Sequence, residues 1–323
     1  MMITKRGRGR YQGASAAAMK HHYDVSNEFF RLWLGPTLAY SSALWEDGET
    51  DLETAQYRKM DYLIDQAGVA PGDRVLDIGC GYGTELRRMI EQCDIRAGVG
   101  VTLSESSVSF VRAQQVPRLE MRWENWVDHR PVERYDAVLS VEAFEHFARP
   151  GMSGARKIRA YRRFFAAVRA MIKTEGKFAL QTITWGRRFP MERQLLADLY
   201  LATKVYPECN PAYLGEILRA CDGLFDVVAL RNDFTHYSRT TAAWVRRLED
   251  NWDTAVDLIG AQRTADFHRC MNTGVRGFAE GWFHLHRLTL QPVPRPSAPA
   301  RRFFVNNVLG LGPTPASARY QPV

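Results

Sequence analysis

Residues 74–84 are Arg-Val-Leu-Asp-Ile-Gly-Cys-Gly-Tyr-Gly-Thr, and this stretch decides the fold. Val75, Leu76 and Ile78 predict a buried parallel strand, which closes on alternating glycines before a helix begins. Glycine lets the backbone turn sharply and approach a ligand where a Cβ would collide. The N–H groups that open the next helix then face an anion. The stretch therefore predicts a nucleotide-type cofactor site.

The glycine spacing excludes two common phosphate-binding turns. The last glycine of the G-x-G-x-x-G dinucleotide pattern is missing, and no Lys-Ser/Thr follows as a P-loop requires. The order from Asp77 to Gly83 instead resembles motif I of class I S-adenosylmethionine-dependent methyltransferases, whose glycines lie against the methionine part of the cofactor. A glycine-rich turn without a ligand is the alternative.

Length and composition indicate a soluble protein of one large domain or one and a half. The 323 residues are 46% hydrophobic. No apolar run approaches the roughly 20 residues that span a bilayer, and no signal-peptide core is present. The five cysteines form no Cys-x-x-Cys pair, so neither a metal site nor a disulfide framework is expected, and a cytoplasmic location fits best.

Part of the net charge of +7 lies near the two ends of the chain. The basic residues there are Lys5, Arg6, Arg8, Arg10, Arg295, Arg301 and Arg302. Such runs are usually solvated, but an anionic membrane surface or a carrier protein could bind them peripherally. Nothing indicates nucleic-acid binding, and the sequence leaves the oligomeric state open.

Strand and helix patterns alternate along the chain. Strands are expected at 73–78, 97–103, 118–123, 135–141, 177–184, 225–232 and 282–290, the last two as an antiparallel edge. Helices are expected at 26–34, 51–67, 84–92, 105–115, 156–173, 191–204, 211–221 and 241–270. This alternation predicts an α/β fold with a mostly parallel sheet, and the ligand crevice at the carboxyl ends of its strands.

We predict five segments from these patterns. They are a flexible basic tail (1–18), a helical N-terminal lid (19–70), a cofactor-binding core (71–186), a helical insert with C-terminal strands that form the substrate pocket (187–291), and a proline-rich tail (292–323).

Six short sequence patterns follow one another in an order that, taken together, is specific for one protein family. They are His22-Tyr23-Asp24-Val25-Ser26-Asn27-Glu28-Phe29-Phe30, Ala39-Tyr40-Ser41-Ser42-Ala43, the 77–83 stretch, Gly100-Val101-Thr102-Leu103-Ser104, Glu142-Ala143-Phe144-Glu145-His146-Phe147 and Thr235-His236-Tyr237-Ser238-Arg239-Thr240. In this order they resemble the cyclopropane-fatty-acid synthase family, which includes the mycolic acid cyclopropane synthases. The resemblance implies a class I methyltransferase, Rossmann-like doubly wound fold with a seven-stranded sheet, a helical N-terminal lid and a helical insert.

The resemblance also implies S-adenosylmethionine as cofactor and particular contacts to it. Tyr40 and Ser41 would close over the cofactor. Asp77, Gly79 and Gly81 would hold its methionine end, and Thr102 and Leu103 would meet the ribose. Glu124 and Trp126 would bracket the adenine, and Val141 at a strand end is a further expected contact.

The implied reaction is methyl transfer to an alkene carbon of a lipid-like, polyketide or isoprenoid substrate. A carbocation forms on the acceptor, and the base that removes a proton decides between a cyclopropane and a methyl-branched product. Aromatic side chains can stabilise this cation through their π faces. We expect the hydrophobic substrate to contact Tyr23, Phe144, Phe147, Ile183, Trp185 and Tyr200.

In the family the base is a bicarbonate ion. By resemblance Glu145, Tyr237 and the backbone of Ile183 would hold it, whereas Ser42 and Gln181 replace a cysteine and a histidine of the family pattern. Both can hydrogen-bond an anion, but Gln cannot exchange protons as His can. The sequence therefore leaves bicarbonate binding open, and Glu145 acting directly as base is a second possibility.

Two other functions remain as alternatives. Plant alkaloid N-methyltransferases that resemble this family carry a Glu-His pair at the same place, so Glu145 and His146 could serve as base for N- or C-methylation of a small specialised metabolite. A non-catalytic lipid-binding or scaffold protein could also retain the fold.

Overall fold

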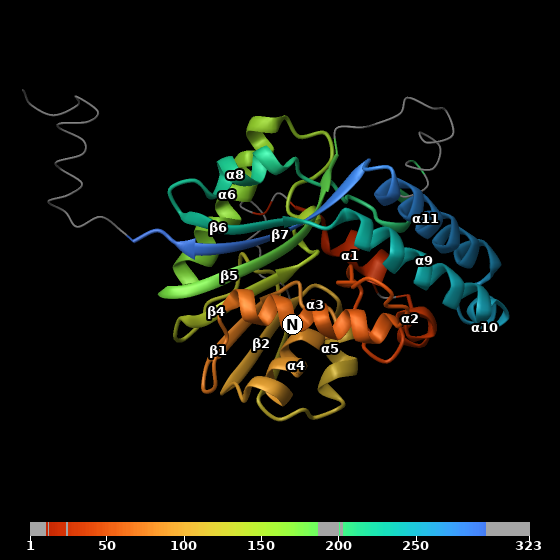
Figure 1. The fold of residues 1–323 in the computed structure, drawn as a ribbon, viewed down its shortest axis with the longest axis horizontal. Coiled ribbons are helices and arrows are strands. Elements are labelled where there is room, and N and C mark those ends of the chain that lie inside the picture. Colours follow the sequence, from red (N-terminus) through yellow and green to blue (C-terminus); the bar gives the residue numbers. More distant parts are fainter. Residues whose placement is uncertain (1–10, 12, 24, 187–199, 201–202, 295–323) are drawn as a thin grey trace, which may run out of the picture. The chain divides into compact units, whose positions relative to one another are not determined.

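The structure, a computed structural model, describes residues 11, 13–23, 25–186, 200 and 203–294. The chain divides into the units Met1–Pro292 and Val293–Val323, and the fold described here is that of the first. Its centre is a seven-stranded sheet of order β3-β2-β1-β4-β5-β7-β6 (Figure 1). The strands are β1 (Arg74–Ile78), β2 (Ala97–Thr102), β3 (Leu119–Trp123), β4 (Tyr135–Val141), β5 (Ile172–Trp185), β6 (Phe225–Asn232) and β7 (Phe283–Pro292).

The predicted α/β fold with a mostly parallel sheet is confirmed, and the last two strands bring antiparallel pairing to its edge, as expected. β1 to β5 pair in parallel, while β7 is antiparallel to both of its neighbours, β5 and β6. The path from β5 to β6 passes through helix α8 (Leu214–Cys221), and such a crossover returns the chain in the same direction. β7 then fills the gap between these two strands.

Helices lie on both faces of the sheet (Figure 1), and alternate residues of β1 pack against opposite layers. Leu76 and Ile78 pack with α6 (Gly154–Met171) and α8 in one buried cluster. Val75 packs on the other face with α3 (Leu52–Ala67) and α4 (Thr84–Cys93). Because both faces are covered, the strand is apolar at successive positions, as its sequence predicted.

A third apolar cluster packs the N-terminal lid region against three helices of the C-terminal third of the chain. It contains α2 (Asn27–Leu34), α9 (Phe234–Asp250), α10 (Trp252–Ile259) and α11 (Ala261–Ala279), which lie together beside the sheet (Figure 1). Ring pairs connect them: Phe29 packs on Phe267 at 5.0 Å and Trp33 on Trp244 at 5.5 Å between centroids. We call these four helices the cap.

The expected single helix over 241–270 is wrong, because this segment is divided among α9, α10 and α11. α9 begins earlier, at Phe234, and the segment is interrupted at Asn251 and again at Gly260, where φ is +85°. The short apolar α10 then turns back on α11, and an uninterrupted helix could not make this contact.

The N-terminal segment is ordered further toward its start than we expected. Ala14 is fully buried and its N–H donates to the carbonyl of His146 at 2.7 Å. Helix α1 (Ala16–Tyr23) begins inside the predicted tail, so residue 18 is not the boundary of the fold. α5 (Glu105–Arg112) and the short 3-10 helix η1 (Phe144–His146) complete the elements near the site.

Two sequence predictions fall on residues that the structure does not describe. Most of the expected helix 191–204 and most of the proline-rich tail lie outside the described residues. Within the described part of the chain, none of the helices has the length and apolar character needed to cross a membrane.

Candidate active site

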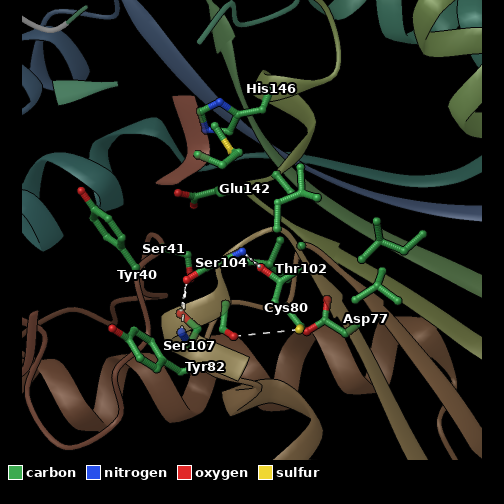
Figure 2. A pocket seen from close by; sticks show the side chains of 18 of the residues that line it. Tyr40, Ser41, Asp77, Cys80, Tyr82, Thr102, Ser104, Ser107, Glu142 and His146 are labelled. Atoms are coloured by element: carbon green, nitrogen blue, oxygen red, sulfur yellow. Dashed lines mark hydrogen bonds between the residues drawn. The ribbon is translucent and has the colours of Figure 1, made fainter. Parts of the chain in front are cut away.

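A pocket opens at the carboxyl ends of β1, β2, β3 and β4, where the topology predicts a ligand (Figure 2). Every cofactor contact expected from the sequence lines it. These residues are Tyr40, Ser41, Asp77, Gly79, Gly81, Thr102, Leu103, Glu124, Trp126 and Val141. Since they come from segments far apart in the chain, only the fold brings them together. We call this space the cofactor pocket.

The glycine turn after β1 has two separate structural reasons. Gly79 has φ +82°, and a Cβ there would lie 2.2 Å from the Cβ of Ala143. This glycine therefore allows two loops to touch. Gly81 has φ +49°, and a Cβ there would find no atom within 4 Å, so this position borders the open pocket.

Asp77 supplies a buried negative charge at the base of the cofactor pocket. Its side chain is 1% exposed, and neither carboxylate oxygen has a hydrogen-bond partner among the described residues. Burial and the nearby Glu85 raise the pKa of Asp77 well above its usual range, while the charge of Lys59 opposes this rise. A bound cation would give this carboxylate the partner that it lacks.

Lys59, which no sequence pattern singled out, organises this end of the pocket. Its fully buried ammonium lies 2.5 Å from Glu85 and donates to the hydroxyl of Ser41 at 3.0 Å. The lysine thereby connects α3 to α4 and to the segment that carries Tyr40. Only the tertiary packing of α3 against α4 reveals this ion pair.

The part of the cofactor pocket expected to hold adenine is formed partly by side chains of the hydrophobic core. Trp126 lines the pocket, but its ring also packs against Phe147 at 5.5 Å and Phe164 at 5.3 Å. Glu124 hydrogen-bonds His129 at 2.5 Å, and this bond lowers the pKa of Glu124. The carboxylate thus stays ionised as an acceptor at the pocket edge.

A second pocket meets the first at Tyr40, Glu142 and His146, which line both. Its wall is largely apolar and aromatic. The further lining residues are Glu145, Ile183, Trp185, Thr203, Tyr206, Cys209, Pro211, Tyr237, Thr241, Trp244, Cys270, Met271, Thr273, Gly274, Phe278 and Phe283. We call this space the acceptor pocket.

Five of the expected catalytic and substrate residues line the acceptor pocket: Glu145, His146, Tyr237, Ile183 and Trp185. Ser42 and Gln181 do not line it, and both are fully buried behind Glu142.

The remaining substrate residues lie elsewhere. Phe144 is fully buried and stacks on Tyr161 at 4.4 Å, because η1 turns it into the core, so its expected substrate contact is wrong. Phe147 lines the cofactor pocket and not the acceptor pocket. Tyr200 is 68% exposed and lines neither pocket. The side chain of Tyr23 lies outside the described residues.

Sequence reasoning missed the wall that the cap contributes. Tyr237, Thr241 and Trp244 share one face of α9 at helical spacing, and residues 270, 271, 274 and 278 do the same on α11. This periodicity is present in the sequence. It indicates only a buried helix face, however, and not that the face borders a cavity.

Glu145 is held as a neutral acid at neutral pH. One oxygen, Oε1, accepts from the hydroxyl of Thr182 at 2.8 Å and from the N–H of Ile183, while Oε2 is buried without a partner among the described residues. Burial and the charge of Glu142 raise the pKa of Glu145 to about 8. His146 is also neutral, because burial lowers its pKa to about 4.

Glu142 is the largest omission of the sequence analysis, which placed no role on it. Its Oε1 accepts from the N–H of Ser42 at 2.9 Å and from Nε2 of Gln181 at 2.7 Å. Its Oε2 accepts from the hydroxyl of Tyr237 at 2.5 Å. Three of the five residues expected to hold an external anion, Ser42, Gln181 and Tyr237, therefore bind this carboxylate instead.

Comparison with known proteins gives the family. The family model described as mycolic acid cyclopropane synthetase matches residues 11–288. The chain belongs to this family. Cyclopropane mycolic acid synthase 3 of Mycobacterium tuberculosis is 31% identical over 288 residues, covering 84% of this chain and 95% of that relative. Cyclopropane mycolic acid synthase 2 of Mycobacterium bovis is 31% identical over 268 residues, covering 78% and 86%.

Solved structures agree with this membership of the mycolic acid cyclopropane synthetase family. The cyclopropane synthase MmaA2 from Mycobacterium tuberculosis has a TM-score of 0.78 at 28% identity, covering 86% of this chain and 98% of that chain. The mycolic acid cyclopropane synthase CmaA1 complexed with SAH and CTAB also has a TM-score of 0.78, at 26% identity and 86% and 99% coverage.

The sequence predictions of family, class I methyltransferase fold and enzyme class are thus confirmed, and the protein is an S-adenosylmethionine-dependent methyltransferase. The described residues fit this cofactor. An unpartnered buried carboxylate suits its cationic methionine end, and the backbone at Gly81 leaves space where the ligand approaches.

Proposed function

We propose that this methyltransferase adds a methyl group to an alkene carbon of a neutral, hydrophobic substrate of the lipid-like, polyketide or isoprenoid class, giving a cyclopropane or methyl-branched product. The observation that carries the proposal is the junction of the two pockets at Tyr40, Glu142 and His146. A cofactor in the first pocket can present its methyl group to an acceptor in the second only through this junction.

The lining of the acceptor pocket supports a hydrophobic acceptor. Among its described residues there is no Lys, Arg or Asp that could pair with a charged head group at the reacting end. Aromatic rings surround the space instead: Tyr237 stacks on Phe278 at 4.2 Å, and Trp185 packs on Phe283 at 5.3 Å. Such a wall favours burial of an apolar chain.

The same wall suits the chemistry of alkene methylation. The cofactor supplies a methyl group already activated by positive sulfur, so the first step needs positioning and exclusion of water more than acid or base. The positive charge then passes to carbon. The π faces of Tyr237, Trp244 and Phe278 border the space where this cation forms and can stabilise it.

Contacts beyond the pockets remain part of the proposal. The expected cytoplasmic location rests on the scattered cysteines. The peripheral contact with an anionic membrane or carrier protein depends on basic residues near the two ends, which lie outside the described residues. A lipid acceptor would explain such contact, because the substrate would then reside in or near a membrane.

The test combines cofactor with a panel of acceptors. We would incubate the protein with S-adenosylmethionine labelled in its methyl group and with vesicles of monounsaturated phosphatidylglycerol, unsaturated fatty acids, isoprenoid alcohols and secondary amines. Mass spectrometry would detect methylated products, and NMR would locate the new carbon.

We expect a new C–C bond at a former alkene. Methylation of amines alone would instead favour the small-metabolite alternative, and failure to bind S-adenosylmethionine in calorimetry would favour a scaffold.

A further inference from the structure

We propose that Glu142 is the enzyme's own base: its carboxylate takes the proton that leaves the methylated substrate, in the place where the family resemblance implies a bicarbonate ion. This inference rests on the proposed alkene methylation. It adds a catalytic residue and removes a requirement for an external anion.

The position of Glu142 is the first argument. Its side chain lines both pockets, with Tyr40 and His146 as the other residues that do so. Figure 2 shows Glu142 and His146 at the cofactor pocket together with Tyr40 and Asp77. A base must reach the carbon that has just received the methyl group, and this carbon lies where the pockets meet.

The hydrogen bonds of Glu142 are the second argument. The N–H of Ser42, the amide of Gln181 and the hydroxyl of Tyr237 all donate to it. These are three of the five chain positions to which the resemblance assigned bicarbonate binding; the other two, Glu145 and the backbone of Ile183, bind each other. A carboxylate and a bicarbonate ion offer the same planar pair of oxygens, so the protein fills this anion site with a side chain.

A contact on the far side of Gln181 sets the orientation of its amide group and so the direction of its hydrogen bond to Glu142. Nε of Arg287 donates to Oε1 of Gln181 at 2.8 Å, and Arg287 in turn pairs with Asp233. Because arginine only donates, the Gln181 oxygen must face it and the amide NH₂ must face Glu142. Glu142 therefore receives donors on both oxygens and is held as an acceptor.

One acceptor position on Glu142 stays available. A carboxylate has about four lone-pair sites, and the donors use two on Oε1 and one on Oε2. The last site is on Oε2, and Glu142 lines both pockets. Burial raises the pKa of both carboxyl groups, but at Glu142 the three hydrogen-bond donors and the charge of Lys59 oppose this rise. At Glu145 the charge of Glu142 adds to the rise and brings the pKa to about 8, so Glu142 is the better held of the two as a carboxylate.

The backbone at Glu142 is a third, independent observation. Its φ is +51°, a left-handed conformation that is uncommon for residues other than glycine. Residues held in such conformations cluster at active sites, where the surrounding structure maintains them. Here the N–H of Glu142 donates to the carbonyl of Gln181 at 2.8 Å, which ties the strained residue to β5.

The proton balance closes without another reactant. The alkene π pair forms the new C–C bond, the S–CH₃ bond breaks with its electrons passing to sulfur, and the positive charge moves to the neighbouring carbon. Oε2 of Glu142 then takes a proton from the new methyl group, and the released C–H pair closes a cyclopropane. Loss of a proton from an adjacent carbon gives a methyl-branched alkene instead. Glu142 finally returns its proton to solvent after product release.

The first test removes the carboxylate and keeps the shape. With the alkene acceptor that turns over in the panel, Glu142→Gln should lower the rate of product formation by about a hundredfold or more, while its affinity for S-adenosylmethionine changes less than about threefold. Glu53→Gln is the matched control, because this carboxylate pairs with Arg247 outside both pockets. The control should keep the wild-type rate.

The second test asks whether the anion site reopens and needs no acceptor. Glu142→Ala should bind ¹³C-bicarbonate and formate, seen as saturable shifts in ¹³C NMR, whereas the wild-type protein should bind neither. With the acceptor present, formate should restore part of the lost activity of Glu142→Ala. These results would not be expected if Glu142 only supported the fold.

A third readout is the pH profile. The titratable and charged groups around Glu142 are Tyr40, Lys59, Glu145, His146, Tyr237 and Arg287. Tyr237→Phe removes one donor and so favours the protonated carboxyl, which should move the acidic limb of the rate profile up by about one pH unit or more.

Three results would overturn the inference: a wild-type rate in Glu142→Gln, loss of cofactor binding in parallel with activity, or wild-type activity that falls in bicarbonate-depleted buffer and returns with added bicarbonate. Absence of alkene methylation by the wild-type protein would instead refute the proposed function. The ¹³C-bicarbonate experiment would still decide whether Glu142 fills the anion site.

Discussion

Replacing Asp77 by alanine should separate cofactor binding from stability. The carboxylate is buried, neither oxygen has a partner among the described residues, and Glu85 lies close enough to raise its pKa. In the ligand-free protein this charge is unfavourable. The ammonium group at the methionine end of S-adenosylmethionine is the cation that would pair with it.

The magnitude follows from the loss of a buried ion pair. Removing one partner of such a pair costs about 3–5 kcal/mol, and we take about 3 kcal/mol because the ammonium can keep some water in the pocket. The dissociation constant should then rise by roughly a hundredfold. At a cofactor concentration of about 100 times the wild-type Kd, stabilisation by ligand should fall from about 2.7 to about 0.4 kcal/mol.

The assay pairs calorimetric titration with thermal unfolding. We expect Asp77→Ala to bind S-adenosylmethionine weakly, while the melting temperature of the ligand-free protein stays the same or rises. Asp61→Asn is a control, because this exposed carboxylate pairs with Arg88 at 2.8 Å outside the cofactor pocket. An unchanged affinity, or a loss of affinity together with a lower ligand-free melting temperature, would refute the assignment.

Three further predictions follow from the described contacts. Gly79→Ala should lower stability by about 3 kcal/mol, because its methyl group would lie 2.2 Å from a facing Cβ in addition to the strain of φ +82°. Gly81→Ala should cost only the strain of its φ of +49°, about 1 kcal/mol, and should raise the Kd of the cofactor because this position borders the open pocket; unfolding and titration of both variants compare them. Lys59→Met should destabilise the protein by about 3 kcal/mol or more by leaving Glu85 buried without its partner, and the double variant with Glu85→Gln should recover most of this loss in urea unfolding. Burial and the charge of Glu142 raise the pKa of Glu145 to about 8 in the native state, so the native protein keeps a proton that the unfolded chain loses, and the free energy of unfolding falls as pH rises from about 4 to 8. Glu145→Gln should flatten this pH dependence, by about 5 kcal/mol at most. An unchanged slope in this variant would contradict the assignment.

The sheet could be predicted because its strands carry strong local signals. β1 is apolar at successive positions and ends in a glycine turn, and helix patterns follow β1, β2 and β4 in the sequence. Antiparallel pairing of the last two strands was expected, but that β7 and not β6 runs against the rest of the sheet could not be predicted this way. An apolar strand has the same composition in either direction, and only the connection through α11 and the pairing with β5 decide it.

The cofactor side of the site was predictable for a related reason. Once parallel strands are ordered, their carboxyl ends converge, so residues just after β1, β2 and β4 must meet. The acceptor side depends on how α9 and α11 pack over that edge. Their pocket-facing side chains, such as Trp244 and Met271, look in the sequence like any buried helix face.

Single positions within a predicted segment were harder still. The Glu142–Phe147 stretch was expected to face the substrate, but η1 sends Phe144 into the core and Glu145 toward the acceptor pocket. Glu142 adopts a left-handed backbone that no sequence rule assigns to glutamate. Its role depends on Gln181 and Tyr237, which approach from distant parts of the chain.

A carboxylate at the junction of the two pockets affects the two steps of the reaction differently. Before transfer the positive charge is on sulfur, and afterwards it is on carbon on the other side of the same junction, so Glu142 attracts both. Attraction that is equal in the ground state and the transition state does not raise kcat. The advantage of Glu142 must therefore come at the proton-transfer step, where its free Oε2 site acts and where a neutral amide cannot replace it. It follows that Glu142→Gln should slow product formation far more than it weakens S-adenosylmethionine binding, whereas a purely electrostatic role would reduce both together.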